Sequence, residues 1–359
     1  FKSVSGSIPE LSVSYSSTTT MGNGPLLCGL KKADDSAEAF LTYEEIIVTT
    51  SEQLVLRVQH PVYKSDKTTK YQVHGVVGQG TFGRVLQVTR RGKRKFYAMK
   101  QLFKSQFITQ DCLKKLERER NLVAAVDFPF IVKLICLCKD ENCVYFVLEF
   151  APCGDFAALL KEHCFDESST RFYIAQIVMA LEYLHAGRIV HRDVKPANLL
   201  VNSDGCLKLA DFTFTKQLND DRTFTICGTK LYMAPEIREG NGYGISVDWW
   251  AVGMITAEIC RLYRIKMQKA SKWAVPPSDD LAEFTEALME LNLADRLRTA
   301  NDIRMHPFFS TINWTTFYRK NYTPPVERPP TVAVVRCDTL TVKLDMQVEV
   351  SGLDFDWFC

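Results

Sequence analysis

The sequence lacks a charge excess and a long apolar run. Its 44 Lys and Arg residues are balanced by 42 Asp and Glu residues, which gives a formal net charge of +2. Near-neutrality provides no bulk attraction to nucleic acid or to an anionic membrane. The best membrane-span candidate, AVGMITAEIC, is far shorter than the roughly 18 residues required and carries Glu258. We therefore expect no nucleic-acid partner and no transmembrane segment.

Paired cysteine motifs of the CxxC type are also missing. The twelve cysteines are scattered through apolar segments, and the single CxC pair, Cys136 and Cys138, has the periodicity of a strand. This pattern favours reduced core thiols over disulfides or metal ligands, and thus a cytoplasmic location. Because the chain begins with Phe1 instead of Met, we expect it to be part of a longer protein.

The 359 residues are 46% hydrophobic, which is enough for a full core. Ten of the first twenty residues are Ser or Thr, so residues 1–30 are predicted to be a disordered linker. Residues 31–70 form an N-terminal extension in this interpretation. Within it, residues 38–60 mix helix-like and strand-like apolar spacing, and no single element is predicted there.

From Tyr71 onward the pattern changes to a β-rich part and then an α-rich part. Strands are predicted in YQVHGVV, RVLQVTR, KFYAMKQL, FIVKLICLCK and CVYFVLEF, and helices in DCLKKLERERNLVAAV and RFYIAQIVMALEYLHAG. The second helix is expected to stop at Gly187. We predict an α+β protein with a small β-rich lobe, a larger α-rich lobe and a hinge near residues 149–154.

A glycine-rich segment, GQGTFGRV, lies between two predicted strands. Gly78, Gly80 and Gly83 are followed by Val85 in a GxGxxGxV pattern. Glycines in such a turn let backbone N–H groups approach phosphate closely. Alone the motif is weak, because a glycine-rich hairpin without a ligand has the same appearance.

An ion pair is predicted next to that segment. Lys100 ends an apolar strand fifteen residues after Val85, and Glu119 follows nineteen residues later on the inward side of the predicted helix. Such a pair is positioned to hold phosphate oxygens. The alternative for Lys100 is an ordinary surface lysine.

The loop HRDVKPAN supplies three further polar groups, Asp193, Lys195 and Asn198, and Asp211 follows eighteen residues after Asp193. An acid to orient a hydroxyl, a lysine for developing charge, and Asn with Asp for a divalent metal form the set required by phosphoryl transfer. Taken alone, Asp211 is equally typical of a turn cap at the end of a strand.

With these motifs in order, residues 71–310 resemble the eukaryotic protein kinases. FPF at 128–130, TFTICGTKLYMAPE at 223–236, DWWAVG at 248–253 and the terminal FDWF are similar to the AGC group. Within that group, the segments ERERNLVAAVDFPFIVKL and SGLDFDWF are most similar to the cGMP- or cAMP-dependent kinases. The resemblance implies a bilobal kinase fold over residues 71–309, with an N-lobe at 71–149 that has one main helix, a helical C-lobe at 155–309, and an AGC-type C-terminal tail at 310–359.

The resemblance also implies the residues that bind ATP and Mg²⁺. ATP would be held by Gly78, Gly80, Gly83, Val85, Ala98, Lys100, Glu119, Leu148, Glu149 and Ala151. Asp193, Lys195 and Asn198 would be catalytic, and Asn198 and Asp211 would ligate Mg²⁺. Val123, Leu134, His191 and Phe212 would form an apolar spine, while Glu236, Arg296 and Asp248 would brace the large lobe. For these last residues plain core packing is an equivalent interpretation.

Regulation and substrate choice are implied in the same way. Thr225 would be phosphorylated, with Arg192, Lys216 and Lys115 as its phosphate pocket. Asp155, Glu258 and Thr229 would bind protein substrates that carry basic residues before the target Ser or Thr. A cyclic-nucleotide-binding regulatory domain or subunit would lie outside this chain, since residues 1–70 contain no such cassette.

Four departures from the family pattern keep two hypotheses open. Thr213 replaces a glycine, Lys230 and Leu231 replace Pro-Glu, Ala197 replaces an acid, and the segment after Cys260 is short. A β-branched residue at 213 would cost about 1 kcal/mol if its φ had to be positive. The chain is thus either an Mg·ATP-dependent serine/threonine kinase or a nucleotide-binding pseudokinase that acts as a scaffold.

The C-terminal tail ends in three aromatic residues within GLDFDWFC. In the AGC pattern Phe355 and Phe358 would fill an apolar pocket beside the helix that carries Glu119. Cys359 stands where many relatives have a phosphorylated Ser or Thr, so docking is expected to need no phosphate. The alternative is a terminus that binds another protein.

Overall fold

The computed structural model describes residues 41–80, 83–107, 109–270, 275–326 and 355–359. The predicted linker at 1–30, the start of the N-terminal extension and the middle of the tail lie outside these ranges. Among the described residues, no helix is long and apolar enough to cross a membrane. The ten cysteines that fall within the described ranges are free thiols.

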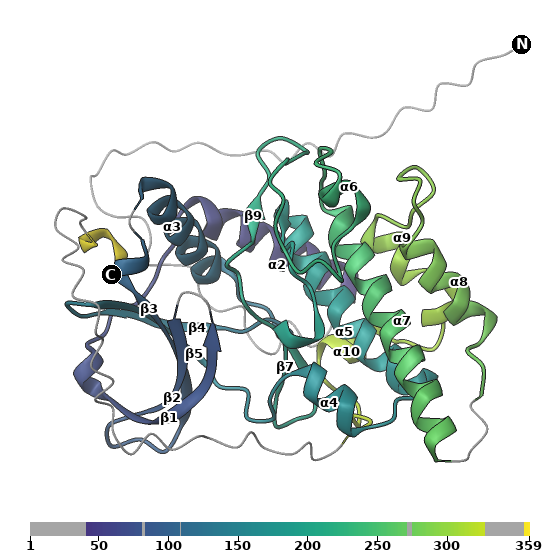
Figure 1. The fold of residues 1–359 in the computed structure, drawn as a ribbon, viewed down its shortest axis with the longest axis horizontal. Helices are drawn as coiled ribbons and strands as arrows, with labels where there is room; N and C mark the ends of the chain where they lie inside the picture. Colours follow the sequence, from purple (N-terminus) through teal and green to yellow (C-terminus); the bar gives the residue numbers. More distant parts are fainter. Residues whose placement is uncertain (1–40, 81–82, 108, 271–274, 327–354) are drawn as a thin grey trace, which may run out of the picture. The chain divides into compact units, whose positions relative to one another are not determined.

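The small lobe is built on one antiparallel sheet in the order β1-β2-β3-β5-β4 (Figure 1). Its strands are β1 Tyr71–Gly80, β2 Gly83–Arg90, β3 Phe96–Phe103, β4 Leu134–Lys139 and β5 Cys143–Glu149. On β3, Met99 is buried in a cluster that includes Leu86 and Val88. Because neighbouring side chains in a strand point to opposite faces, Lys100 projects from the other face.

Helix α3, Gln110–Ala125, covers that other face of the sheet. Thr109 caps it by accepting a hydrogen bond from the backbone N–H of Cys112. Leu116 and Val123 are buried, and Glu119 shares their side of the helix. The predicted main helix of the small lobe is therefore present, with its one inward carboxylate facing the sheet.

The large lobe is mainly helical around α5, Glu167–Ala186. Nearly every residue of α5 from Thr170 to His185 is buried, as expected for a helix packed on all sides. Its other helices are α4 Phe156–Glu162, α6 Pro235–Arg238, α7 Ser246–Lys269, α8 Asp279–Leu288, α9 Ala300–Arg304 and α10 Trp314–Tyr318. Short 3₁₀ turns lie at Thr68–Lys70, Lys104–Gln106, Pro196–Asn198, Pro307–Phe309 and Asp356–Phe358.

Two small antiparallel ribbons hold the loops that carry polar residues. One pairs β6, Ile189–Val190, with β9, Lys216–Gln217; the other pairs β7, Leu199–Val201, with β8, Leu207–Leu209. The HRDVKPAN loop thus starts from β6 and ends at β7, and Asp211 comes two residues after the end of β8. The protein therefore has the expected bilobal α+β architecture.

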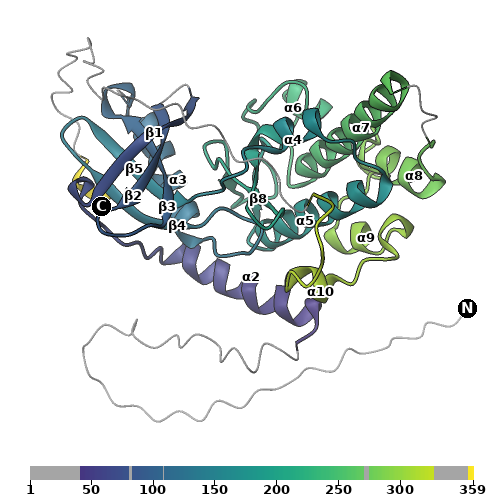
Figure 2. The same ribbon diagram turned by 90° about the horizontal axis from the view of Figure 1, so that it is seen from below.

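Residues 38–60, where no single element is predicted from the sequence, contain helix α2, Tyr43–Gln59. Thr42 and Glu45 form a capping box at its start. Figure 2 shows α2 extending from beside the small lobe to α10, and it contacts α3 and α5 as well. Leu54 is fully buried. The segment LVLRV, which begins at Leu54, has the composition of a strand, but it is helical because Leu54 is buried against α5.

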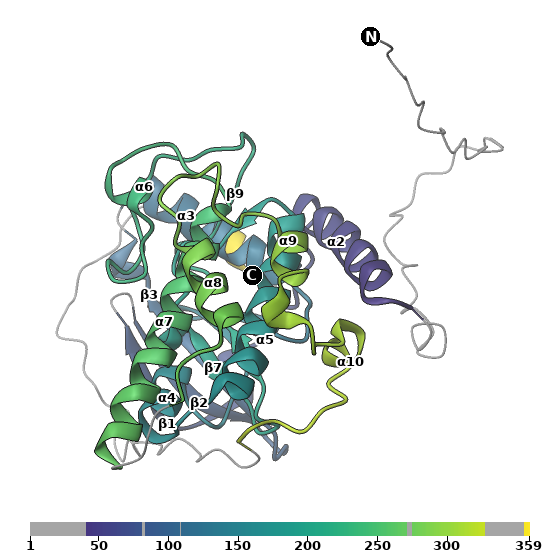
Figure 3. The same cartoon turned by 90° about the vertical axis from the view of Figure 1, so that its right-hand side faces the viewer.

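Helix α7 explains the short segment after Cys260. The helix continues without interruption to Lys269, and the next helix, α8, begins at Asp279 (Figure 3). Lys266, in the last turns of α7, lies 2.5 Å from the carbonyl oxygen of Leu160 in α4. Helical residues thus occupy the first part of the segment after Cys260, up to Lys269.

Candidate active site

Lys100 is the centre of the charged groups contributed by the small lobe. Its Nζ lies 2.7 Å from Glu119 Oε1 and 3.2 Å from Asp211 Oδ1. Burial opposes the charged form of Lys100, but the two neighbouring carboxylates raise its pKa above its usual range. Strand β3, helix α3 and the segment after β8 therefore meet at one ammonium group.

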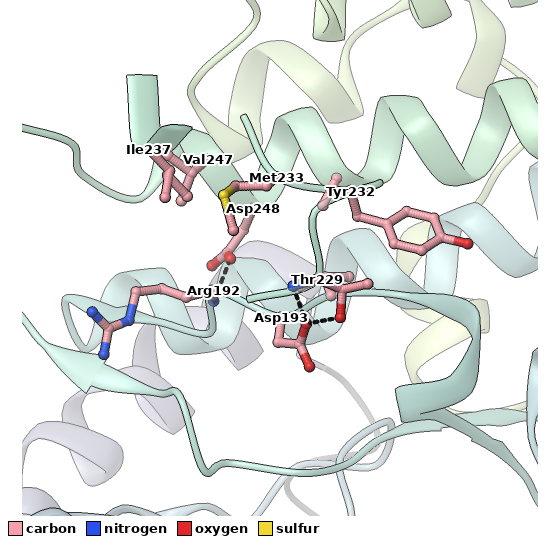
Figure 4. Close-up of a pocket in the computed structure, with 10 residues that line it drawn as sticks. Arg192, Asp193, Thr229, Tyr232, Met233, Ile237, Val247 and Asp248 are labelled. Carbon is pink, nitrogen blue, oxygen red and sulfur yellow. Dashed lines mark hydrogen bonds between the residues drawn. The ribbon is translucent and has the colours of Figure 1, made fainter. Parts of the chain in front are cut away.

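Asp193 is held by residues from two loops. Lys195 Nζ lies 2.7 Å from Asp193 Oδ2, and Asn198 Nδ2 donates to the Asp193 backbone carbonyl at 2.8 Å and to Oδ2 at 2.9 Å. On the opposite oxygen, Oδ1, Thr229 donates from its backbone N at 2.9 Å and from its hydroxyl at 2.6 Å (Figure 4). Asp193, Lys195, Asn198 and Thr229 therefore form one hydrogen-bonded cluster.

The backbone of the HRDVKPAN loop is anchored by Asp248 in the first turn of α7. Its carboxylate accepts hydrogen bonds from the backbone N–H groups of His191 at 2.9 Å and Arg192 at 2.8 Å, and from His185 Nε2 at 2.8 Å. Burial opposes ionisation of Asp248, yet the partner His185 lowers its pKa. Arg192 has a φ of 69°, which L-residues rarely adopt, and Asp248 holds it there.

Asp211 also has a left-handed backbone, with a φ of 63°. The next residue, Phe212, is buried, and its ring lies 5.5 Å from that of His191. Burial opposes ionisation of Asp211, but the charge of Lys100 and hydrogen bonds from Thr213 and Lys100 lower its pKa to about 2. The Asp211 side chain is 41% exposed, so an ionised carboxylate faces the space between the lobes.

Asn198 and Asp211 have side-chain oxygens, the ligand type that a magnesium ion prefers. The two N–H groups of the Asn198 amide are used on Asp193, which leaves its carbonyl oxygen as an acceptor. Mg²⁺ is usually held by one or two protein oxygens, with substrate phosphates and water completing its shell. In the described ranges no group of three or more His, Cys, Asp or Glu side chains gathers to hold a metal. The expected pair is compatible with a metal that binds together with nucleotide.

The expected nucleotide-binding residues lie in the sheet and just after it. Val85 pairs with Lys100, Ala98 pairs with Leu148, and Gly78 pairs with Val85 across neighbouring strands. The other expected residues are Gly80 and Gly83 at the β1–β2 turn, Glu149 at the end of β5, and Ala151 just beyond it. Gly83 is required for packing, since a Cβ there would lie 1.8 Å from the carbonyl oxygen of Gln101.

Comparison with known proteins decides the family. The protein kinase domain family matches residues 71–309. The RAC family serine/threonine-protein kinase homolog of Dictyostelium discoideum is 34% identical over 299 residues, which cover 78% of this chain and 67% of that protein. The chain belongs to the protein kinase family and is of the AGC type.

Other relatives of this kinase are considerably longer. The cAMP-dependent protein kinase catalytic subunit of Dictyostelium discoideum is 35% identical over 72% of this chain and 43% of its own length. Ribosomal protein S6 kinase alpha-2 of Homo sapiens is 33% identical over 82% of this chain and 43% of its own length. The match to this kinase thus spans less than half of each of these two relatives.

The kinase has a group of cations near the exposed Thr225. Arg192 Nη1 donates to the Tyr243 hydroxyl at 3.3 Å, and that hydroxyl donates to the carbonyl oxygen of Thr225. Burial together with the charges of Arg192 and Arg118 lowers the pKa of Lys216. Arg118, which lies one helical turn after the expected Lys115 on α3, is not among the residues predicted from the sequence.

The expected substrate-binding acids of the kinase have local partners. Asp155 caps α4 by accepting from the backbone N–H of Ala158 at 2.8 Å, and Glu258 accepts from the Tyr232 hydroxyl at 2.6 Å. Leu231, beside Tyr232, is 63% exposed. Each acid therefore has a structural role, and a role in substrate binding would be additional to it.

The end of the chain is docked on the small lobe of the kinase. Phe355 and Phe358 are buried, and the Phe358 ring lies 5.4 Å from that of Phe146 in β5. Arg120 of α3 donates to the backbone carbonyl of Trp357. Burial raises the pKa of the Cys359 thiol to about 11, so the thiol stays neutral. The two rings occupy an apolar site on the small lobe.

Proposed function

We propose that this kinase transfers the γ-phosphoryl group of Mg·ATP to Ser or Thr hydroxyls of protein substrates. The observation that carries the proposal is the position of Lys100, whose ammonium group joins Glu119 at 2.7 Å and Asp211 at 3.2 Å. This ion pair and the metal-binding aspartate must both be in place for phosphoryl transfer in protein kinases.

Each polar group has a defined task in this proposal. Lys100, with Glu119 behind it, holds phosphate oxygens, and Gly78, Gly80 and Gly83 allow the backbone to approach them. Asp193 orients the substrate hydroxyl and accepts its proton, because its carboxylate is fixed on both oxygens by Lys195, Asn198 and Thr229. Lys195, whose Nζ lies 2.7 Å from Asp193 Oδ2, stabilises charge on the transferred group in this proposal. When bound between Asn198 and Asp211, Mg²⁺ supplies charge neutralisation for the phosphates.

Regulation and location extend the proposal. Two of the relatives are named cAMP-dependent protein kinase catalytic subunits, which supports a cyclic-nucleotide-binding regulatory domain or subunit as a partner of this kinase. The substrates are proposed to carry basic residues before the phosphorylated Ser or Thr, read by Asp155 and Glu258. A cytoplasmic location follows from the free thiols as part of the same proposal.

The experiment compares the full chain with its Asp193→Asn variant, using ATP, MgCl₂ and a basic Ser peptide. The wild type is expected to phosphorylate the peptide, and the variant is expected to lose at least about a hundredfold in kcat while it still binds nucleotide. Equal lack of transfer in both proteins, with nucleotide binding retained, would establish the pseudokinase scaffold instead.

A further inference from the structure

The hydroxyl group of Thr213 lies among the three charged groups of the small-lobe side of the site. Its Oγ1 is 2.7 Å from Asp211 Oδ1, 3.0 Å from Lys100 Nζ and 3.4 Å from Glu119 Oε1. A hydroxyl has one proton to donate and lone pairs to accept with. The shortest contact assigns the proton to Asp211, and the ammonium of Lys100 donates to the same oxygen.

The backbone of Thr213 carries no strain of its own. The described residues with a left-handed backbone include Asp211, at a φ of 63°, but not Thr213. The condition under which a β-branched residue would be costly at position 213 is therefore not met. The unusual backbone belongs to Asp211, and such conformations persist where the surroundings hold them. The Thr213 hydroxyl is one of the groups that hold Asp211.

The three protons of the Lys100 ammonium group are divided among its neighbours. Glu119, Thr213 and Asp211 accept from it at 2.7, 3.0 and 3.2 Å. An ammonium group has only three N–H donors, so contacts with phosphate oxygens require it to release at least one of these partners. The bond from Thr213 to Asp211 does not involve Lys100, and it can remain when Lys100 turns to a phosphate.

We propose that the hydroxyl of Thr213 is a positioning group that fixes Asp211 for binding a divalent cation. It holds Oδ1 of the carboxylate and leaves Oδ2 for the metal. The inference rests on the proposed function only in taking Asp211 as a metal ligand.

Two variants separate the hydroxyl from the shape of the side chain. Thr213→Val keeps the β-branch and removes the hydroxyl, whereas Thr213→Ser keeps the hydroxyl and removes the branch. The measurement is ADP affinity by isothermal titration over a series of Mg²⁺ concentrations, which yields the half-saturating Mg²⁺ concentration without any turnover. Thr213→Ala, which also lacks the hydroxyl, replaces the valine variant if valine does not fold, as checked by metal-free thermal unfolding.

Loss of a hydrogen bond to a charged group predicts about a tenfold or greater rise in half-saturating Mg²⁺ for Thr213→Val, and a change within about twofold for Thr213→Ser. Metal-free ADP affinity should stay within about twofold of wild type in both variants. An unchanged Mg²⁺ requirement in Thr213→Val, or an equal rise in Thr213→Ser, would overturn the proposal.

The same titration keeps this inference distinct from the proposed function. A wild-type chain that transfers no phosphate would refute the kinase activity, but the Mg²⁺ shift of Thr213→Val would still support the role of the hydroxyl. Full phosphotransfer with no Mg²⁺ shift in Thr213→Val would refute the role of Thr213 alone.

Discussion

The guanidinium group of Arg192 lies 3.3 Å from the hydroxyl of Tyr243, and this hydroxyl donates to the backbone carbonyl of Thr225. The loop that carries Thr225 is therefore tied to the residue directly before Asp193. Burial and the charges of Arg192 and Arg118 lower the pKa of Lys216. These cations repel one another until an anion arrives.

We predict that active kinase carries a phosphate on Thr225. Thr225→Ala should lower kcat by about tenfold or more, since the cations then lack the anion that orders the loop. Mass spectrometry of the active fraction detects the phosphate, and peptide assays give the rate. Undiminished turnover of Thr225→Ala, or active protein without phosphate there, would contradict the prediction.

A matched pair of variants identifies the cation that α3 supplies. Lys115 and Arg118 are both exposed and lie one helical turn apart. The charge of Arg118 lowers the pKa of Lys216. Arg118→Gln is therefore expected to weaken the effect of Thr225 phosphorylation on kcat more than Lys115→Gln does. The reverse order would restore Lys115 as the pocket residue.

Substrate choice should show a preference for Arg before the Ser or Thr. A carboxylate that meets a guanidinium makes a strong, directional contact, and Glu258 and Asp155 are the candidates. The preference should be weak, because Ala197 removes a neighbouring acid. Glu258→Gln should reduce discrimination between Arg and Ala peptides by about five- to tenfold in kcat/KM. A positional peptide library that favours acidic residues before the acceptor would refute this.

The docked tail should stabilise the small lobe. Phe358 is fully buried, so Phe358→Ala should lower the free energy of unfolding by about 3 kcal/mol or more. Asp356→Asn is the control, because the Asp356 side chain is 89% exposed in its 2.8 Å ion pair with Lys139 and exposed ion pairs contribute little to stability. Thermal unfolding and turnover after deletion of residues 355–359 complete the test. If neither changes, the tail serves a partner protein.

The contact between α2 and the end of α5 can be tested through one glycine. Gly187 has an ordinary φ of −83°, but an added Cβ would lie 2.8 Å from Cδ2 of Leu54. Gly187→Ala should therefore cost about 1 to 3 kcal/mol by overpacking. In Leu54→Ala the clash is absent, so the double variant should cost less than the sum of the single changes. Strict additivity in denaturant unfolding would mean that the two residues do not interact.

Much of the site was predictable because its residues are close in sequence or fixed by strand and helix periodicity. Alternation along β3 places Lys100 opposite Met99, and helical spacing places Glu119 with Leu116. One loop supplies Asp193, Lys195 and Asn198, so their short separation in sequence was sufficient to predict that they lie together.

The rest depended on contacts between distant segments. Helix α2 exists because Leu54 is buried against α5, whereas LVLRV alone is typical of a strand. Arg118 and Lys115 are equivalent in sequence, and only the placement of Lys216 separates them. For Thr213 the sequence predicts only an effect on the backbone, because the direction of its hydroxyl depends on where Lys100 and Asp211 lie.

The most direct test of the account is the fate of the terminal phosphate of ATP. The kinase would be incubated with Mg²⁺, a basic Ser peptide and ATP labelled in its γ-phosphoryl group, with Asp193→Asn alongside. The account predicts label on the peptide Ser hydroxyl with the wild type and at most about a hundredth of that rate with the variant. Bound nucleotide with no labelled peptide above the level of Asp193→Asn would contradict it.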